Sequence, residues 1–212
     1  MQSKTHWLID LDNTLHQADY YIYPQINRLM SEYIQTYLGF NEEQSDHIRL
    51  LYWRKYGATL IGLMKLHDID PYHFLDFTHS FDLDASKLLA RPNLKNVLGE
   101  LSGKKIIFSN APFNYIIRVL SILKIDRLFH DVISIEHTKF KPKPCIKGFR
   151  EILTKRKINP LSCVMIEDTL QNLRTASRLG VRTIWVSGVH RKPSWLDFRI
   201  AHIGKLALFL RR

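Results

Sequence analysis

The sequence predicts an α/β fold in which a parallel sheet carries helices on both faces and an all-helical segment is inserted near its start. Two observations predict this fold. Short apolar runs of strand length alternate with helical segments at the start of the chain and again from about residue 91. Between residues 16 and 90 we find helical spacing and no convincing strand. We therefore expect two domains, a core made of 1–15 and 91–212 and a helical domain at 16–90.

The elements follow in order along the chain. In the core, strands are expected at 6–9, 104–109, 132–135, 162–166 and 182–186, and helices at 113–123, 145–155 and 169–179. In the insertion, apolar residues repeat at three and four between Ile26 and Tyr37, which predicts a helix after Pro24. Further helices are expected at 42–55, 57–66 and 71–79, opened by Asn41 and by Asp70 with Pro71. The tail, 190–212, is predicted to form a last helix.

Composition bounds the classes of function. The chain has 212 residues, of which 45% are hydrophobic and 24% charged, and this excludes a disordered or disulfide-rich protein. The net charge is +11, but residues 1–90 carry −5 and residues 91–212 carry +16. Such a charge suggests a nucleic acid, an anionic membrane or a small anion as partner. Cys145 and Cys163 fit reduced thiols, and no signal peptide or membrane span is expected, so we predict a cytoplasmic protein.

Polar side chains follow the ends of the expected strands. Asp10 and Asp12 follow the first strand, and Thr14 comes directly after them. Later strand ends carry a Ser-Asn pair, a Lys-Pro-Lys-Pro run and a Glu-Asp pair with an asparagine beyond it, namely Ser109, Asn110, Lys141, Lys143, Glu167, Asp168 and Asn172. In parallel sheets ligands bind at the carboxyl ends of the strands. We therefore expect acids, a hydroxyl, an amide and a lysine to converge at one edge of the sheet.

These four motifs, in this order, resemble those of the haloacid dehalogenase (HAD) superfamily of phosphohydrolases. The resemblance implies a Rossmann-like core with an inserted C1-type cap. Within the superfamily the chain is most similar to the pyrimidine 5′-nucleotidases, through DLDNTLH after the first strand, YWRKYGATLIGL at 52–63, FSNAP at 108–112 and EDTLQNL at 167–173. An acid at position 12 resembles the phosphatase and mutase branches, because the true dehalogenases of the superfamily lack it and use no Mg²⁺. The sugar phosphomutases are a poorer match, because the inserted segment lacks the phrases associated with them.

By this resemblance Asp10 is the nucleophile and Asp12 the general acid and base. Mg²⁺ is held by Asp10, the backbone carbonyl of Asp12, and Asp168. Further roles are implied for residues around them: Ser109, Asn110 and Thr14 bind phosphate or orient the motif, Glu167 and Asn172 support the ligands or contact metal-bound water, and a lysine stabilises the transition state. Lys143 is favoured over Lys141, because Phe149 lies six residues beyond it as the family pattern requires.

Several readings stay open at this point. His16, Arg54, Tyr56 and Gly57 are candidate substrate contacts, with packing, turn or hinge roles as the alternatives. The favoured function is Mg²⁺-dependent hydrolysis of a pyrimidine nucleoside 5′-monophosphate, UMP or CMP, as part of nucleotide metabolism. Another small phosphomonoester, such as a sugar phosphate, is the alternative substrate. A basic nucleic-acid-binding protein without catalysis is the alternative class, and neither nucleic acid nor membrane is the expected partner. The sequence indicates no oligomeric state.

Overall fold

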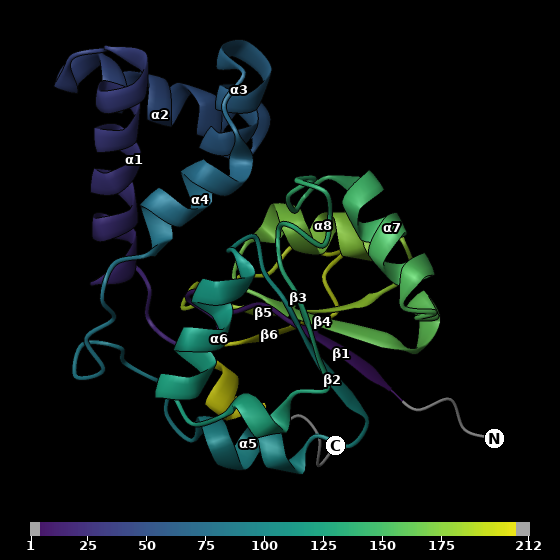
Figure 1. Cartoon of the computed structure of the whole chain (residues 1–212). Coiled ribbons are helices and arrows are strands. Elements are labelled where there is room, and N and C mark those ends of the chain that lie inside the picture. Colours follow the sequence, from purple (N-terminus) through teal and green to yellow (C-terminus); the bar gives the residue numbers. More distant parts are fainter. Residues whose placement is uncertain (1–4, 207–212) are drawn as a thin grey trace. The chain divides into compact units, whose positions relative to one another are not determined.

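The computed structural model describes residues 5–206, and these form two compact units (Figure 1). One unit comprises the chain up to Gln17 and from Ala85 onward, and the other is Ala18–Asp84. The first unit is the α/β core, and the second contains only helices. The two domains expected from the sequence, divided after residues 15 and 90, remain a prediction, and the compact units divide the chain a few residues away from those positions.

A single parallel sheet of six strands organises the described part of the core. Its spatial order is β3-β2-β1-β4-β5-β6, with bounds β1 His6–Ile9, β2 Lys104–Phe108, β3 Asp131–Ile133, β4 Cys163–Glu167, β5 Arg182–Val186 and β6 Phe198–Ile200. β1 lies at the centre, paired in parallel with β2 on one side and with β4 on the other. The chain thus changes direction of winding beside β1, and this is the place where ligands bind in open parallel sheets.

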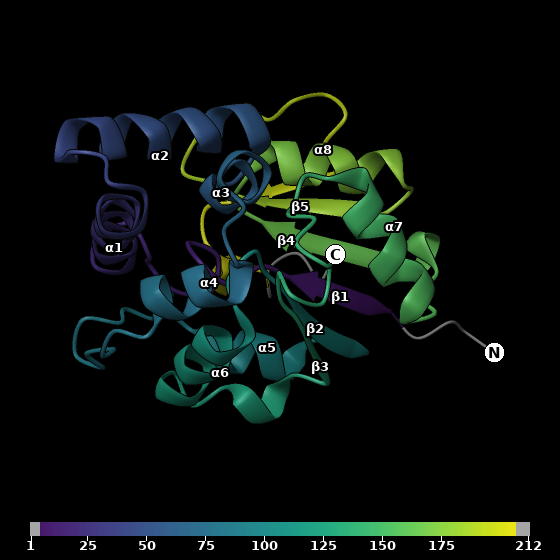
Figure 2. The same ribbon diagram turned by 45° about the horizontal axis from the view of Figure 1, so that its top comes forward.

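Helices cover both faces of the sheet, as Figures 1 and 2 show. The helices α7 (Ile146–Lys155) and α8 (Leu170–Arg178) lie on one face, and α5 (Leu94–Glu100) and α6 (Phe113–Ile122) lie on the other. Neighbouring strands point Leu8, Ile106 and Met165 to the same face, where they pack with Phe149 of α7 and Leu173 of α8. The α/β class with a Rossmann-like parallel sheet is therefore confirmed.

The helical unit contains α1 (Ile22–Leu38), α2 (Glu42–Tyr56), α3 (Thr59–His67) and α4 (Pro71–His79). Asn41 caps α2 by accepting a hydrogen bond from the Gln44 amide, and the Gln44 side chain accepts one from the Asn41 amide in return. Asp70 caps α4, with Pro71 in its first turn. Tyr33 is buried among the aromatic rings of Phe74 and Phe77, which joins α1 to α4. The four expected helices of the insertion are confirmed, but α1 begins at Ile22, before Pro24, and α3 begins at Thr59, two residues later than expected.

The expected last helix is wrong within the described residues. Residues 198–200 form β6 instead, and a 3₁₀ turn follows at Ile203–Lys205. The reason is tertiary: Asp197 accepts hydrogen bonds from the amide and the hydroxyl of Thr183, which fixes this segment beside β5. Residues 207–212 of the expected helix lie outside the described residues. None of the helices within residues 5–206 is long and apolar enough to cross a membrane.

Candidate active site

The candidate site lies at the carboxyl end of the sheet, where β1 and β4 run side by side. β1 ends at Ile9 and places Asp10 there, and the Asp10 amide donates to the Ile166 carbonyl of β4 at 3.0 Å. β4 ends at Glu167, directly before Asp168. The two buried strands thus deliver three carboxylates to one position, as the spacing of the motifs predicts. One ligand oxygen from each of Asp10, Glu167 and Asp168 lies within 4.8 Å of the other two.

Lys143 stands inside this group of carboxylates. Its Nζ donates to Asp10 Oδ1, to Glu167 Oε2 and to the Phe108 carbonyl, each at 2.7 Å. The side chains of Lys143 and Glu167 are each 1% exposed, so the three charges interact almost without solvent. Lys141 instead pairs with Glu151 at 2.8 Å, where both side chains are partly exposed. Geometry therefore gives Lys143, and not Lys141, contact with Asp10.

Asn110 holds the backbone of Lys143. Its side-chain amide donates to the Lys143 carbonyl at 3.0 Å, and its side-chain oxygen accepts from the Lys143 amide at 2.8 Å. Ser109 is buried at the end of β2, and its hydroxyl accepts a hydrogen bond from the Ala111 amide. Thr14 donates to Asp10 Oδ2 at 3.0 Å. Lys143 and Thr14 together fix both carboxylate oxygens of Asp10.

The pKa values follow from burial and crowding of like charges. Burial raises the pKa of Asp10 to about 7, and the nearby Glu167 adds to the rise while Lys143 opposes it. Burial likewise raises the pKa of Glu167 to about 7, against the opposing effect of Lys143. The pKa of Asp168 is raised by burial and by Asp10. Burial by itself would lower the pKa of Lys143, but the carboxylates of Asp10 and Glu167 outweigh it and raise that pKa.

This donor set fits a hard divalent cation. Three carboxylate oxygens converge, and the single ammonium of Lys143 cannot balance three negative charges. The raised pKa values of these carboxyl groups show that further positive charge would stabilise their ionised forms. Carboxylate oxygens are the ligands that Mg²⁺ prefers. Glu167, expected to act through other ligands, has its carboxylate in the same cluster as Asp10 and Asp168. Asn172, on α8, is buried.

Asp12 occupies a different environment from Asp10. Its Oδ1 accepts hydrogen bonds from the Tyr115 hydroxyl at 2.7 Å and is 2.9 Å from His16 Nε2. Asn13 adopts the left-handed conformation, with φ of 61°, and Arg91 donates to its carbonyl at 2.8 Å. Tyr115 and Arg91 belong to no motif, so the sequence does not predict their place at the site. Their contacts span 103 and 78 residues along the chain, which local patterns do not encode.

Three expected substrate contacts, Arg54, Tyr56 and Gly57, lie in the helical unit. Two of them, Tyr56 and Gly57, make contacts within that unit. Gly57 ends α2 in the left-handed conformation, with φ of 83°, and its amide donates to the Trp53 carbonyl. The ring of Tyr56 faces the ammonium groups of Lys55 and Lys65, at 5.3 and 5.0 Å. Arg54 is exposed in the last turn of α2. Their role toward a substrate stays a prediction.

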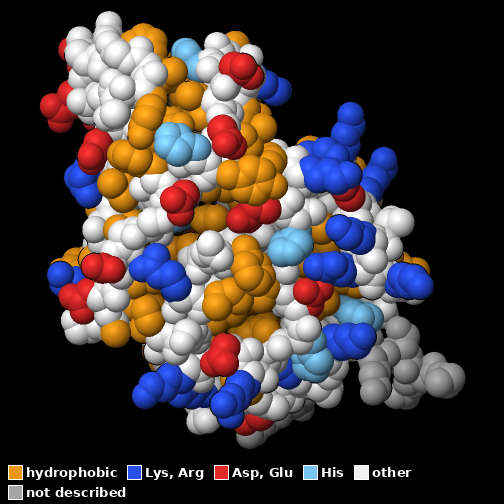
Figure 3. Space-filling model, viewed as in Figure 1, with side chains coloured by type: hydrophobic (Ala, Val, Ile, Leu, Met, Phe, Trp, Pro, Cys, Tyr) orange, Lys and Arg blue, Asp and Glu red, His pale blue; other side chains and the backbone are white. Residues whose placement is uncertain are grey.

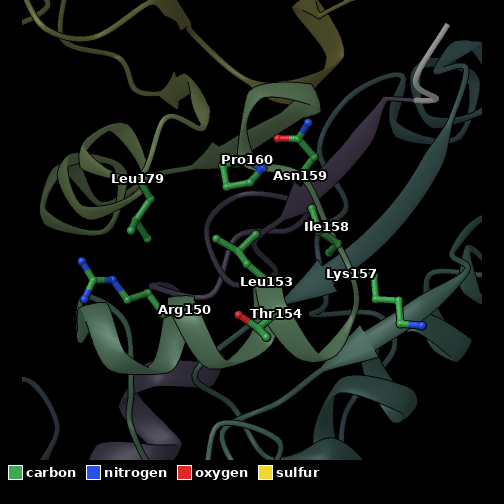
Figure 4. Close-up of a pocket in the computed structure, with 8 residues that line it drawn as sticks. All are labelled: Arg150, Leu153, Thr154, Lys157, Ile158, Asn159, Pro160 and Leu179. Atoms are coloured by element: carbon green, nitrogen blue, oxygen red, sulfur yellow. The ribbon is translucent and has the colours of Figure 1, made fainter.

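A surface hollow of about 510 Å³ lies elsewhere in the core (Figure 4). It is formed by the end of α7, the segment leading into β4 and the end of α8, and its lining residues are Arg150, Leu153, Thr154, Lys157, Ile158, Asn159, Pro160 and Leu179. The lining residues 157–160 lead into the start of β4, whereas Glu167 and Asp168 come at its end, so the hollow lies at the opposite edge of the sheet. It contains no carboxylate and is separate from the candidate site.

A part of the positive charge of the core lies on α7. Lys147, Arg150 and Lys155 are exposed there, and Lys and Arg side chains concentrate over this helix in Figure 3. The Lys/Arg-rich run at 139–157 is partly neutralised by local pairs, because Lys139 and Lys141 pair with Glu151, and Arg156 pairs with Asp131. Only Lys143 of this run reaches the carboxylates of the site. With three Lys/Arg and one Glu, α7 accounts for only a part of the charge excess of the core.

Known proteins resemble this chain over most of its length. Residues 7–186 match the family described as haloacid dehalogenase-like hydrolase. The chain belongs to this family of hydrolases. It is 25% identical over 192 residues to Phosphate metabolism protein 8 of Saccharomyces cerevisiae. That alignment covers 82% of this chain but only 59% of the yeast protein, so the chain spans about three fifths of its relative's length.

Solved structures share the fold of this hydrolase. A HAD phosphatase from Thermococcus onnurineus aligns with a TM-score of 0.65 and 21% identity, covering 98% of both chains. The L-2-haloacid dehalogenase from Xanthobacter autotrophicus, solved with chloropropionic acid covalently bound, aligns with a TM-score of 0.62 and 14% identity, covering 99% of both chains. Phosphatases and dehalogenases thus share this architecture, and the fold alone does not choose between these reactions.

Proposed function

We propose that this protein is a Mg²⁺-dependent phosphatase that cleaves phosphomonoesters through an aspartyl-phosphate on Asp10. One observation carries the proposal: three carboxylates, from Asp10, Glu167 and Asp168, converge around the single ammonium of Lys143. Such a cluster suits a divalent cation and a phosphate dianion. Asp12, two residues after the nucleophile, supports phosphatase over dehalogenase chemistry, because the dehalogenases of the family lack this acid.

The proposed reaction has two steps. An Asp10 carboxylate oxygen attacks phosphorus, the ester P–O bond breaks, and Asp12 gives its proton to the leaving alcohol oxygen. Asp12 then takes a proton from water, whose oxygen attacks the phosphorus of the aspartyl-phosphate, and phosphate leaves with Asp10 restored. Lys143 and Thr14 hold the Asp10 carboxylate in one orientation through both steps. Ser109 and the backbone at Asn110 bind the phosphoryl oxygens.

Asp10, Asp168 and the backbone carbonyl of Asp12 are the proposed ligands of Mg²⁺, and the position of the Glu167 carboxylate adds it as a further candidate. When bound, the cation neutralises the carboxylates and the phosphoryl oxygens, so that one anion can approach another. Lys143, whose ammonium already contacts Asp10, contributes positive charge to the same transition state.

The proposed substrate is a pyrimidine nucleoside 5′-monophosphate, UMP or CMP. This finer assignment rests on the sequence phrases shared with the 5′-nucleotidases. The helical unit Ala18–Asp84, which includes Arg54 and Tyr56, is proposed to act as a C1-type cap that selects the substrate. The name of the yeast relative, which refers to phosphate metabolism, agrees with a phosphorylated substrate. The protein is proposed to act in the cytoplasm.

A substrate panel tests the proposal. Phosphate release is measured with Mg²⁺ for nucleoside monophosphates and sugar phosphates, using the wild type, Asp10→Asn and Lys141→Met. We expect UMP and CMP to be hydrolysed fastest, Asp10→Asn to be inactive, and EDTA to abolish activity. Undiminished release by Asp10→Asn would overturn the catalytic proposal. A preference for sugar phosphates that Asp10→Asn abolishes would overturn only the pyrimidine assignment.

A further inference from the structure

Two hydrogen bonds converge on one oxygen of Asp12. Asp12 Oδ1 accepts from the Tyr115 hydroxyl at 2.7 Å and lies 2.9 Å from His16 Nε2. Tyr115 is 1% exposed, His16 is fully buried, and Asp12 is 9% exposed. A buried polar group without a hydrogen-bond partner costs free energy of folding, so these hydrogen bonds stabilise the positions of Tyr115 and His16 as well as that of the Asp12 carboxylate.

The two partners approach from separate parts of the core. Tyr115 lies in the first turn of α6, after β2. His16 follows the Asp10 motif, and isolated β-bridges join it to Asp12 on one side and to Ala90 on the other. A side chain contacted from two independently anchored elements has little freedom to rotate. The orientation of the Asp12 carboxyl group is therefore set by contacts from other parts of the core and not by its own loop alone.

The surroundings of His16 indicate which nitrogen of its ring carries a hydrogen. Its Nδ1 is buried and has no hydrogen-bond partner among the described residues. A proton on Nδ1 would therefore be buried without an acceptor, whereas a proton on Nε2 meets the Asp12 carboxylate. The geometry thus favours a hydrogen on Nε2, from which the ring donates to Asp12. Both Tyr115 and His16 are then donors to Oδ1, and the two in-plane lone pairs of that oxygen are occupied.

We propose that Tyr115 and His16 are positioning residues that act on catalysis through Asp12. By holding Oδ1, they fix the direction in which the Asp12 carboxyl group presents its proton to the leaving group. This inference rests on the proposed role of Asp12 as general acid. Tyr115 and His16 differ in this role from the residues that bind phosphate or metal, because neither the Tyr115 hydroxyl nor the His16 imidazole needs to contact the substrate.

The proposal predicts a dependence on the leaving group. An alkoxide leaves only with a proton from Asp12, whereas p-nitrophenolate is a stable anion that leaves without one. For Tyr115→Phe we expect kcat/KM to fall about tenfold for the alkyl phosphomonoester that the substrate panel ranks first, a part of the ~100- to 10,000-fold that a general acid contributes. For p-nitrophenyl phosphate kcat/KM should change little, because the first irreversible step needs no acid.

His16 supplies a second and independent test. His16→Leu removes the donor and should show the same selective loss, whereas the amide of His16→Gln can donate again and should restore part of the activity on the alkyl ester. Tyr72→Phe is the matched control, because it removes a hydroxyl from a side chain that is 62% exposed in the helical unit. Thermal unfolding of every variant measures any loss of structure separately.

The outcomes distinguish this inference from the proposed function. Equal losses on both substrates in Tyr115→Phe and His16→Leu would overturn the positioning role, and so would no loss on either substrate. If Asp12→Asn is impaired on the alkyl ester and Tyr115→Phe is not, only this inference fails. If Asp12→Asn keeps full activity on the alkyl ester, the proposed role of Asp12 fails. In the double variant, Tyr115→Phe should add no further loss to Asp12→Asn, because both act through the same carboxyl group.

Discussion

Replacing Lys143 by methionine removes the ammonium from the carboxylate cluster while nearly keeping the volume of the side chain. The two carboxylates that it contacts are buried, with side chains 9% exposed in Asp10 and 1% in Glu167. Each charged hydrogen bond contributes roughly 1.5–3 kcal/mol. Leaving buried charges unpaired costs about 3–5 kcal/mol, which lowers the Tm of a domain of this size by about 6–20 °C.

Thermal and urea unfolding in EDTA measure this loss. Lys141→Met is the matched control, because Lys141 also precedes a proline and also pairs with a glutamate, but at the exposed surface. Exposed pairs contribute little to stability, so this variant should unfold close to the wild type. Equal stability of the two variants would refute the reasoning, since Lys143 would then not hold Asp10 and Glu167 in solution.

Three further predictions concern other parts of the core. The pKa of Asp10 is about 7 in the folded protein against an ordinary 3.8, so the stability that this group contributes is full below about pH 4 and is lost as the pH rises through about 7. In EDTA, Asp10→Asn should therefore gain stability relative to the wild type across this window, and a difference that is constant with pH would contradict the reasoning. Burial raises the pKa of Cys163 to about 12, so a thiol reagent at neutral pH should modify the partly exposed Cys145 alone in the folded protein and both cysteines in urea. Two rapidly reacting thiols before unfolding would show that Cys163 is accessible. A Cβ at Gly148 would collide with the Lys141 carbonyl, so Gly148→Ala should cost about 1–3 kcal/mol in urea unfolding. Gly99→Ala, where the Cβ meets open space, is its control, and equal effects would contradict the collision.

The candidate site was predictable where strands end. The strands that precede Asp10 and Glu167 are short, apolar and fully buried near their ends, so their carboxyl ends could be located from the sequence. The topology then brings those ends together, because β1 pairs directly with β4. The preference for Lys143 over Lys141 is matched by its contact with Asp10.

Elements that depend on distant partners were not predictable. The helix α5 has seven residues, contains Gly99 and has no side-chain cap, so local signals for it are weak. The strand β6 has only three residues, and the contact of Asp197 with Thr183 holds its segment beside β5. Because this contact cannot be seen in the local sequence, the basic tail was expected to form a helix. Tyr115 contacts Asp12 and Arg91 contacts Asn13 only in the folded chain. The residue types and their positions in the sequence do not predict these contacts.

The central position of β1 has a consequence for the order of events during synthesis. β1 is complete at Ile9, but its partners β2 and β4 begin only at Lys104 and Cys163. At about 5–20 residues per second, a ribosome needs roughly 8–30 s to add the 154 residues that separate Ile9 from Cys163. The helices of Ala18–Asp84 can form early in this interval from local contacts, whereas β1 cannot pair until β2 has been made. Asp10, the proposed nucleophile, is thus made long before β4, the other strand that its site needs.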